Sequence, residues 1–183
     1  MGKTKTLLIQ GSPNVGLFGY VTDTYCLIGK GLPEDAIKTF ETSLDVPVHE
    51  ITIGGSQQVG AYLNGTNDIL LVPSVITPQE EEALKEIGIK YAIIDTINTA
   101  LGNNLIVNEH YFFHLPGLEE KAVTAICEAL GVKGEALELK DWEVIGSIIV
   151  VNSKGGLIQK DVPEEIKKHI EEKLKIPLEE GTI

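Results

Sequence analysis

Residues 53–60 read IGGSQQVG and follow PVHEIT, a stretch that predicts a strand. A glycine-rich turn after a strand is the setting in which phosphate-binding loops occur. Such a loop needs a helix directly after it, because the N–H groups and the dipole of that helix face the anion. The sequence instead continues AYLNGTNDILLVP, which predicts a strand and a turn. We therefore interpret the glycines as shaping a turn and not as binding phosphate.

An apolar residue followed by glycine recurs along the chain at a nearly constant interval. The glycines are 44, 42 and 44 residues apart, and they are Gly16, Gly60, Gly102 and Gly146. A second marker is the third residue of LDVPV, IGIKY, LGVKG and LKIPL, which recurs at spacings of 43, 43 and 44 residues. Two independent markers with one period indicate four copies of one structural unit.

Within each period the pattern predicts the same elements: strand, glycine turn, second strand, polar turn, third strand and helix. Prolines begin three of the four expected helices, at Pro33, Pro78 and Pro163. A unit of this size cannot bury its apolar faces alone, and no linker separates the units, so we expect a single α/β domain. The units span approximately residues 1–46, 47–89, 90–132 and 133–176, and residues 177–183 begin a fifth.

The charge of the chain limits its partners. Its net charge is −12, and its fifteen basic residues are all lysines. Arginine is the usual reader of phosphate and guanine, so its absence argues against nucleic acid as the main partner and favours a basic protein surface. The apolar run near the start, LLI, is too short for a signal peptide, and no apolar run is long enough to span a membrane. We therefore expect a cytoplasmic protein without membrane contact.

Two cysteines and two histidines are the residues to which catalysis or metal binding could be assigned. Cys26 and Cys127 lie far apart without metal-site spacing. A disulfide stays open, but two buried reduced thiols are the favoured interpretation. His110 and His114 are four residues apart on an expected strand and would share a face. Because no third ligand is evident, packing roles are favoured for both histidines.

Several motifs, taken in order, resemble one family. They are DTYCLIG, ITIGGSQQVG, ILLVP, TALGNNLIVN, GSIIVVNSKGGL and IPLEEGTI. Together they resemble the translation initiation factor six family, the ribosome anti-association factors, from about residue 6 to residue 183. The resemblance implies a pentein-type αβ propeller, a ring of αβ units with pseudo-fivefold symmetry. It also implies a non-enzymatic monomer without a cofactor. Such a protein binds the large ribosomal subunit, mainly through ribosomal protein, and keeps the small subunit from joining.

The sequence departs from this pattern at its end. Thr182 and Ile183 fall where Thr52-Ile53 and Thr96-Ile97 fall in earlier units. The glycine turn and the remainder of a fifth unit do not follow. A truncated form, further residues that were not included, and a four-unit protein with an open sheet edge are the alternatives, and we expect truncation.

The candidate contact residues are polar positions near the glycine turns and hairpins. The resemblance places Asn103, with the preceding Gly102 in TALGN, on the ribosome-facing surface. Asn67, Asn108 and Asn152 close the expected hairpins. For Asn108 and Asn152, turn geometry alone is the favoured interpretation.

Two other functions stay open. Penteins also include amidine hydrolases and transferases, which use a cysteine nucleophile with histidine and acidic partners. Cys26 and Cys127 lie in apolar contexts, which disfavours that role. The second alternative is a scaffold that binds a protein other than the ribosome through an open sheet edge.

Overall fold

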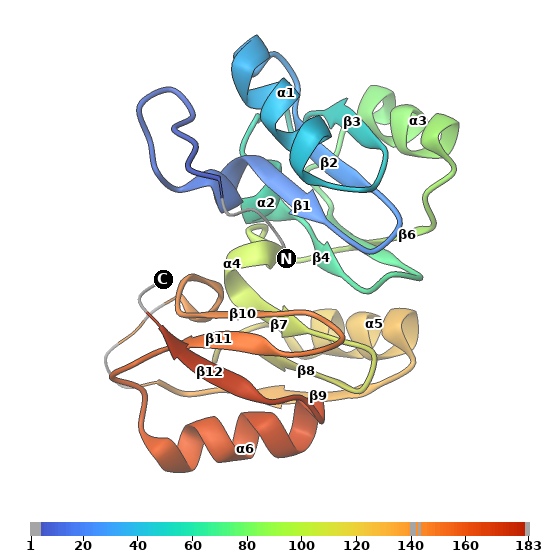
Figure 1. The fold of residues 1–183 in the computed structure, drawn as a ribbon. Helices are drawn as coiled ribbons and strands as arrows, with labels where there is room; N and C mark the ends of the chain where they lie inside the picture. Colours follow the sequence, from blue (N-terminus) through green and yellow to red (C-terminus); the bar gives the residue numbers. More distant parts are fainter. Residues whose placement is uncertain (1–4, 140–141, 143, 182–183) are drawn as a thin grey trace.

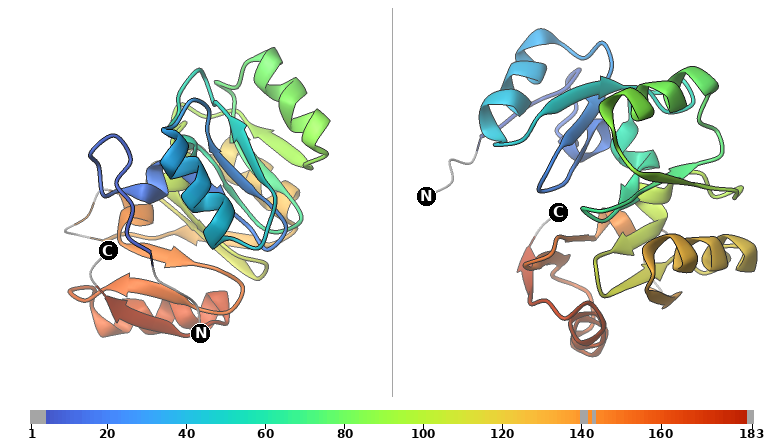
Figure 2. Two further views of the ribbon diagram at one scale, coloured as in Figure 1. Left: turned by 45° about the horizontal axis from the view of Figure 1, so that its top comes forward. Right: turned by 90° about the vertical axis from the view of Figure 1, so that its right-hand side faces the viewer.

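The computed structural model describes residues 5–139, 142 and 144–181. Four small sheets surround a common centre (Figure 1). Each sheet has three strands and carries one long helix on its outer side. The right-hand view of Figure 2 looks along the centre and shows the four sheet-and-helix units following one another around it. The fold is therefore a repeated αβ propeller of the pentein type.

The four units contain the same elements in the same order. Unit 1 contains η1 (Val15–Phe18), β1 (Gly19–Val21), β2 (Cys26–Gly29), α1 (Glu34–Ser43) and β3 (Val48–Ile51). Unit 2 contains α2 (Val59–Tyr62), β4 (Asn64–Gly65), β5 (Leu70–Pro73), α3 (Pro78–Ile87) and β6 (Tyr91–Ile94). Unit 3 contains α4 (Leu101–Asn104), β7 (Leu105–Val107), β8 (Tyr111–His114), α5 (Glu120–Leu130) and β9 (Lys133–Ala136). Unit 4 contains η2 (Ile145–Ser147), β10 (Ile149–Val151), β11 (Gly156–Gln159), α6 (Glu164–Leu174) and β12 (Leu178–Gly181).

One topology is repeated in every unit. The first two strands form an antiparallel hairpin, and the third strand returns after the long helix and pairs in parallel with the second. All four expected long helices are present. Each has acidic residues in its first turn, where the helix dipole favours negative charge, and α3 starts with a capping box between Thr77 and Glu80.

The hydrogen bonds assign one strand differently from the sequence period. The period places residues 177–183 at the start of a fifth unit. In the structure β12 pairs in parallel with β11, with Gly156 opposite Leu178, so it completes the fourth sheet. The same shift applies to every unit, because each strand after a helix belongs to the hairpin before it. Thr182 and Ile183, the marker of the fifth unit, lie outside the described residues.

The recurring glycines lie in one-turn helices at the centre of the molecule. A Cβ on Gly60 would collide with the carbonyl oxygen of Gly16, one on Gly102 with that of Gly60, and one on Gly146 with that of Gly102. The short helices therefore stack backbone against backbone, which is why three of the four copies exclude a side chain here; a Cβ on Gly16 would meet open space. The sequence predicted only a turn here, and the structure adds a helical turn before the second strand.

Apolar side chains from each of the first three units enter the core of the next unit, and one of them comes from the same position each time. Leu27 packs in the core of unit 2, Leu71 in that of unit 3 and Phe113 in that of unit 4, and all three are fully buried. The corresponding residue of unit 4, Leu157, is 48% exposed. Its cross-strand partner Val150 is 53% exposed.

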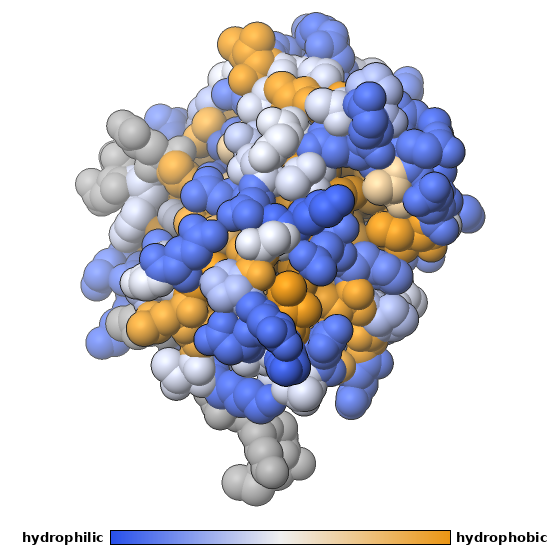
Figure 3. All heavy atoms as spheres, turned by 90° about the horizontal axis from the view of Figure 1, so that it is seen from above, coloured by the Kyte–Doolittle hydropathy of each residue, from blue (hydrophilic) through white to orange (hydrophobic). Residues whose placement is uncertain are grey.

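The core of unit 1 receives no such side chain from the described residues. A hollow of about 330 Å³ lies beside it instead, and its apolar lining includes Val15, Val21, Cys26, Phe40 and Leu44. The surface seen from above is mostly hydrophilic, with scattered apolar patches (Figure 3). Among the described residues, no helix has the length and apolar character needed to cross a membrane.

Candidate protein-binding faces

The inner strands β1, β4, β7 and β10 separate two ends of the molecule. The first end, which we call the axis-helix face, consists of the short helices and the loops 9–14, 53–58 and 95–100 before them. The second end, the hairpin-turn face, consists of the turns 22–25, 66–69, 108–110 and 152–155. In Figure 1 the short helices lie to the left of the inner strands and the hairpin turns to their right.

Asn103 and Gly102 lie on the axis-helix face, within α4. Gly102 is fixed by packing, because its Cα faces the carbonyl oxygens of Gly60 and Leu63. Asn103 is half-buried, and its side chain makes no hydrogen bond within the part of the chain that the structure describes. Its amide is therefore free to bind an external group.

Ile97 is an exposed apolar residue beside α4 that the sequence analysis did not single out. It is 87% exposed. The strand register makes it the counterpart of Gly54, because Ile51 pairs with Gly29 and Ile94 with Pro73 at the same place in their sheets. The buried counterpart of Ile53 is Thr96, which is 5% exposed. No pattern in the sequence distinguished Ile97 as an exposed residue.

In the three loops of the axis-helix face the one charged residue is Asp95, which forms an ion pair with Lys121. Residues 10–18, 53–63 and 97–107 include no Asp, Glu, Lys or Arg, in a chain whose charged fraction is 23%. Exposed amides, hydroxyls and the isolated Ile97 dominate this surface. Such a surface suits direct hydrogen bonding and apolar contact more than long-range electrostatic attraction.

Asn67 and Asn152 lie on the opposite, hairpin-turn face. Asn67 Oδ1 accepts from the backbone N–H of Asp23 at 2.9 Å, and Asn67 Nδ2 donates to Asp23 Oδ2 at 3.1 Å and to Glu109 Oε1 at 3.5 Å. It therefore joins the turns of three units. Asn152 Oδ1 accepts from the N–H groups of Lys154 and Gly155 and shapes its own turn. One flat partner surface cannot contact Asn103 together with these two residues.

The burial of Asn108 removes it from the candidate contact residues. It is 3% exposed. Its Nδ2 donates to the carbonyl of Leu174 at 2.7 Å, and its Oδ1 accepts from the N–H groups of His110 and Tyr111. The residue therefore holds the C-terminus of α6 against the turn of unit 3. Turn and packing geometry account for it, in agreement with the favoured interpretation.

The loop 53–60 already contains its own anion. The Glu80 carboxylate accepts from Thr52 Oγ1 at 2.6 Å and from the N–H groups of Gly54 at 2.9 Å, Gly55 at 2.8 Å and Thr77 at 2.8 Å. A helix does follow this loop, contrary to the prediction, but α2 has only four residues. Phosphate is excluded for a different reason, because Glu80 occupies the glycine N–H groups.

The cysteines do not resemble an activated nucleophile. Cys26 is buried on β2, and burial raises the pKa of its thiol to about 11, which disfavours the thiolate. Cys127 is half-buried on α5. His110 precedes β8, and the His114 ring is within hydrogen-bond distance of the Leu115 carbonyl. The described residues contain no cluster of three potential metal ligands.

Comparison with known proteins identifies the family of the chain. The model of the eIF-6 family matches residues 4–183. The chain belongs to the eIF-6 family. Translation initiation factor 6 of Sulfolobus acidocaldarius is 29% identical, over 97% of this chain and 81% of that protein. Its counterpart in Pyrococcus abyssi is 31% identical, over 94% and 79%, and the eukaryotic factor of Toxoplasma gondii is 27% identical, over 95% and 68%. Family membership supports a role in translation initiation.

Solved structures that resemble this eIF-6 family chain share its fold at low identity. The N-terminal domain of ArgZ superposes with a TM-score of 0.57 at 12% identity, covering 91% of this chain and 66% of that one. SxtG, an amidinotransferase from Microseira wollei, superposes with a TM-score of 0.55 at 9% identity, covering 89% and 60%. These similarities support the pentein fold and carry no argument about activity.

Proposed function

We propose that this protein binds the large ribosomal subunit through its axis-helix face and keeps the small subunit from joining by steric exclusion. The observation that carries the proposal is the family match over residues 4–183, with the free Asn103 amide on a face that has few charged residues. The protein would act as a cytoplasmic monomer without a cofactor, and would mainly contact ribosomal protein.

The axis-helix face is preferred over the hairpin-turn face for a physical reason. Asn103 offers both a donor and an acceptor without a partner in the described chain, and Ile97 offers an exposed apolar side chain close to it in sequence. Interfaces gain most of their affinity from a few such residues when they are enclosed by neutral surroundings. Asn67 and Asn152 already use their amide oxygens within the protein.

Co-sedimentation with purified large ribosomal subunits tests the proposal, followed by a subunit-joining assay. We expect the wild-type chain to pellet with the large subunit and to reduce joining. Asn103→Ala and Ile97→Asp should each weaken binding about tenfold or more while thermal unfolding stays near that of the wild type. Asn152→Ala, on the opposite face, is the matched control and should bind normally.

The outcomes separate the function from the choice of face. A wild-type chain that fails to pellet with large subunits contradicts the proposed function. Binding that is lost in Asn152→Ala but kept in Asn103→Ala and Ile97→Asp would retain the function and move the interface to the hairpin-turn face.

A further inference from the structure

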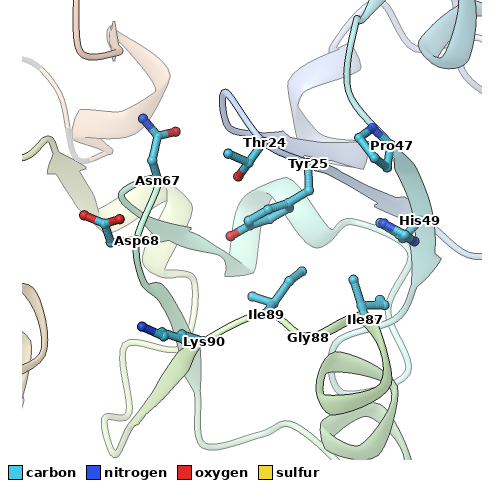
Figure 4. Close-up of a pocket in the computed structure, with 10 residues that line it drawn as sticks. All are labelled: Thr24, Tyr25, Pro47, His49, Asn67, Asp68, Ile87, Gly88, Ile89 and Lys90. Atoms are coloured by element: carbon cyan, nitrogen blue, oxygen red, sulfur yellow. The ribbon is translucent and has the colours of Figure 1, made fainter.

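A pocket on the hairpin-turn face lies at the junction of units 1 and 2. Its volume is about 380 Å³. It is lined by Thr24, Tyr25, Pro47, His49, Asn67, Asp68, Ile87, Gly88, Ile89 and Lys90. Figure 4 shows the Tyr25 ring extending across the pocket, with its hydroxyl directed toward the side that carries Asp68 and Lys90. The pocket lies on the face opposite Asn103, so it is not part of the proposed ribosome-binding surface.

The Tyr25 hydroxyl lies at the surface of this pocket and is not a buried unsatisfied group. The residue is only 9% exposed, and its hydroxyl makes no hydrogen bond within the described chain. Burial raises its pKa to about 12, so the hydroxyl stays neutral. Tyr25 therefore presents an aromatic ring and an unused hydroxyl to the pocket.

The junction of units 3 and 4 shows what fills the equivalent place. Tyr111 corresponds to Tyr25, because the two residues close their hairpins in the same way. The Tyr25 carbonyl accepts from the Thr22 N–H, and the Tyr111 carbonyl accepts from the Asn108 N–H. Lys173 of α6 lies over the Tyr111 ring, with its Nζ 5.1 Å from the ring centroid. The same Nζ is 3.7 Å from Glu135. A cation from the next unit thus covers this tyrosine.

Unit 2 has no cation at the corresponding helix position. Counted from the N-caps Pro163 and Thr77, Lys173 of α6 matches Ile87 of α3 (173 − 163 and 87 − 77). Counted back from the strands β12 and β6, it matches Glu86, which is not a cation either. The shorter, uncharged Ile87 leaves the Tyr25 ring without a covering cation among the described residues. The pocket is therefore the place that a lysine occupies in the fourth unit.

The groups around the pocket favour a positive ligand on a short apolar stem. Asp68 forms no ion pair with a described cation, and the C-terminal end of α3 at Gly88 carries the negative end of the helix dipole. The face of a tyrosine ring attracts ammonium and guanidinium groups. Ile87 and Ile89 provide apolar contact for a stem. The ammonium group of Lys90, another lining residue, opposes a cation here.

We propose that this pocket binds an organic cation, an ammonium or guanidinium group on an aliphatic stem. The cation could be a free small molecule or a lysine or arginine side chain of a second protein. The site takes the place of the intramolecular Lys173 contact and does not depend on the proposed ribosome binding.

Titration of the full chain with n-butylammonium chloride, followed by NMR, tests the ligand chemistry. We expect saturable shifts of the Tyr25 ring and the Ile87 and Ile89 methyl groups, with a dissociation constant on the order of millimolar. Sodium chloride at equal ionic strength and sodium butyrate are the controls. Equal binding of butyrate, or no saturable shift with the ammonium, would overturn the proposal.

Two variants test the site itself. Ile87→Lys supplies the missing cation within the chain and should abolish saturable binding, whereas Ile87→Met keeps an uncharged stem and should retain it. Lys90→Gln removes the opposing charge and should tighten butylammonium binding about threefold or more. Unfolding of Ile87→Lys would leave the Lys90→Gln result decisive. Weaker or unchanged binding in Lys90→Gln contradicts the assignment.

A blocked Gly-Gly-Lys-Gly-Gly peptide distinguishes the two sources of the cation. Tighter binding of the peptide than of butylammonium supports a protein side chain as the ligand. Binding of butylammonium alone supports a free small molecule. Failure of both probes to shift Tyr25 overturns the proposal for either source.

Discussion

Glu80 shows how one residue can organise the loop 53–60. It is 7% exposed, and burial alone would raise the pKa of its carboxyl. Hydrogen bonds from Thr52 and from the N–H groups of Thr77, Gly55 and Gly54 outweigh that effect and hold the pKa below its ordinary value. The carboxylate therefore stays charged and fixes the turn between two units.

Replacement of this carboxylate measures its contribution to stability. We expect Glu80→Gln to lower the free energy of unfolding by about 2 kcal/mol, because an amide cannot accept from all four donors and brings donors of its own. Chemical denaturation gives the value. Glu82→Gln, on the exposed side of the same helix, is the control and should change stability by less than about 0.5 kcal/mol. Equal effects of the two changes would contradict the role of Glu80.

In unit 3 the carboxylate that corresponds to Glu80 belongs to Glu119. Its lowered pKa leads us to expect that stability depends on pH. Hydrogen bonds from Thr96 Oγ1 and from Ile97 N–H lower its pKa to about 2. Because the folded-state pKa lies below the ordinary value of about 4.3, its contribution is complete above the latter and is lost as pH falls toward about 2. Thermal unfolding between pH 6 and pH 2 should therefore decline more steeply for the wild type than for Glu119→Gln. Parallel profiles would contradict this.

At the scale of the elements, the helices and hairpins could be predicted, but the pairing of the strands could not. Pro33, Pro78 and Pro163 correctly marked helix starts, because proline fits the first turn of a helix. The sequence period placed residues 177–183 at the start of a fifth unit, and a period does not determine which strands exchange hydrogen bonds; in the structure β12 pairs with β11. The contact role of Asn108 could not be judged either, since its burial depends on α6, which is 66 residues away at Leu174.

The stacking of the short helices can be tested by the same substitution in two copies of the repeat, one copy serving as the control for the other. A methyl group on Gly102 would collide with the backbone of α2, whereas one on Gly16 meets open space. We expect Gly102→Ala to destabilise the protein by about 3 kcal/mol, because the added methyl group collides with the neighbouring backbone. Gly16→Ala should cost less than about 1 kcal/mol, because alanine has a higher helix propensity than glycine and no collision opposes it. Urea unfolding of both variants measures the difference. A Gly102→Ala variant as stable as Gly16→Ala would show that the stacking is not tight.

At the scale of the whole molecule, contact with the next unit decides whether the apolar residue at the second-strand position is buried. Leu27, Leu71 and Phe113 are fully buried because the next unit covers them, and Leu157 is 48% exposed because no described segment does. The axis-helix face was also beyond prediction in detail. Ile97 is 87% exposed although it is apolar, and only the structure shows that it lies on this face.

The contrast between Leu71 and Leu157 tests whether covering by the next unit stabilises the fold. Leu71→Ala removes a side chain from the core of unit 3 and should cost about 2–5 kcal/mol of unfolding free energy, the range for buried leucine. Leu157→Ala removes the same atoms from a half-exposed site and should cost less than about 1 kcal/mol. Chemical denaturation at equal protein concentration compares them. A cost for Leu157→Ala as large as that for Leu71→Ala would mean that Leu157 is covered in solution, and the fourth sheet would then have a partner.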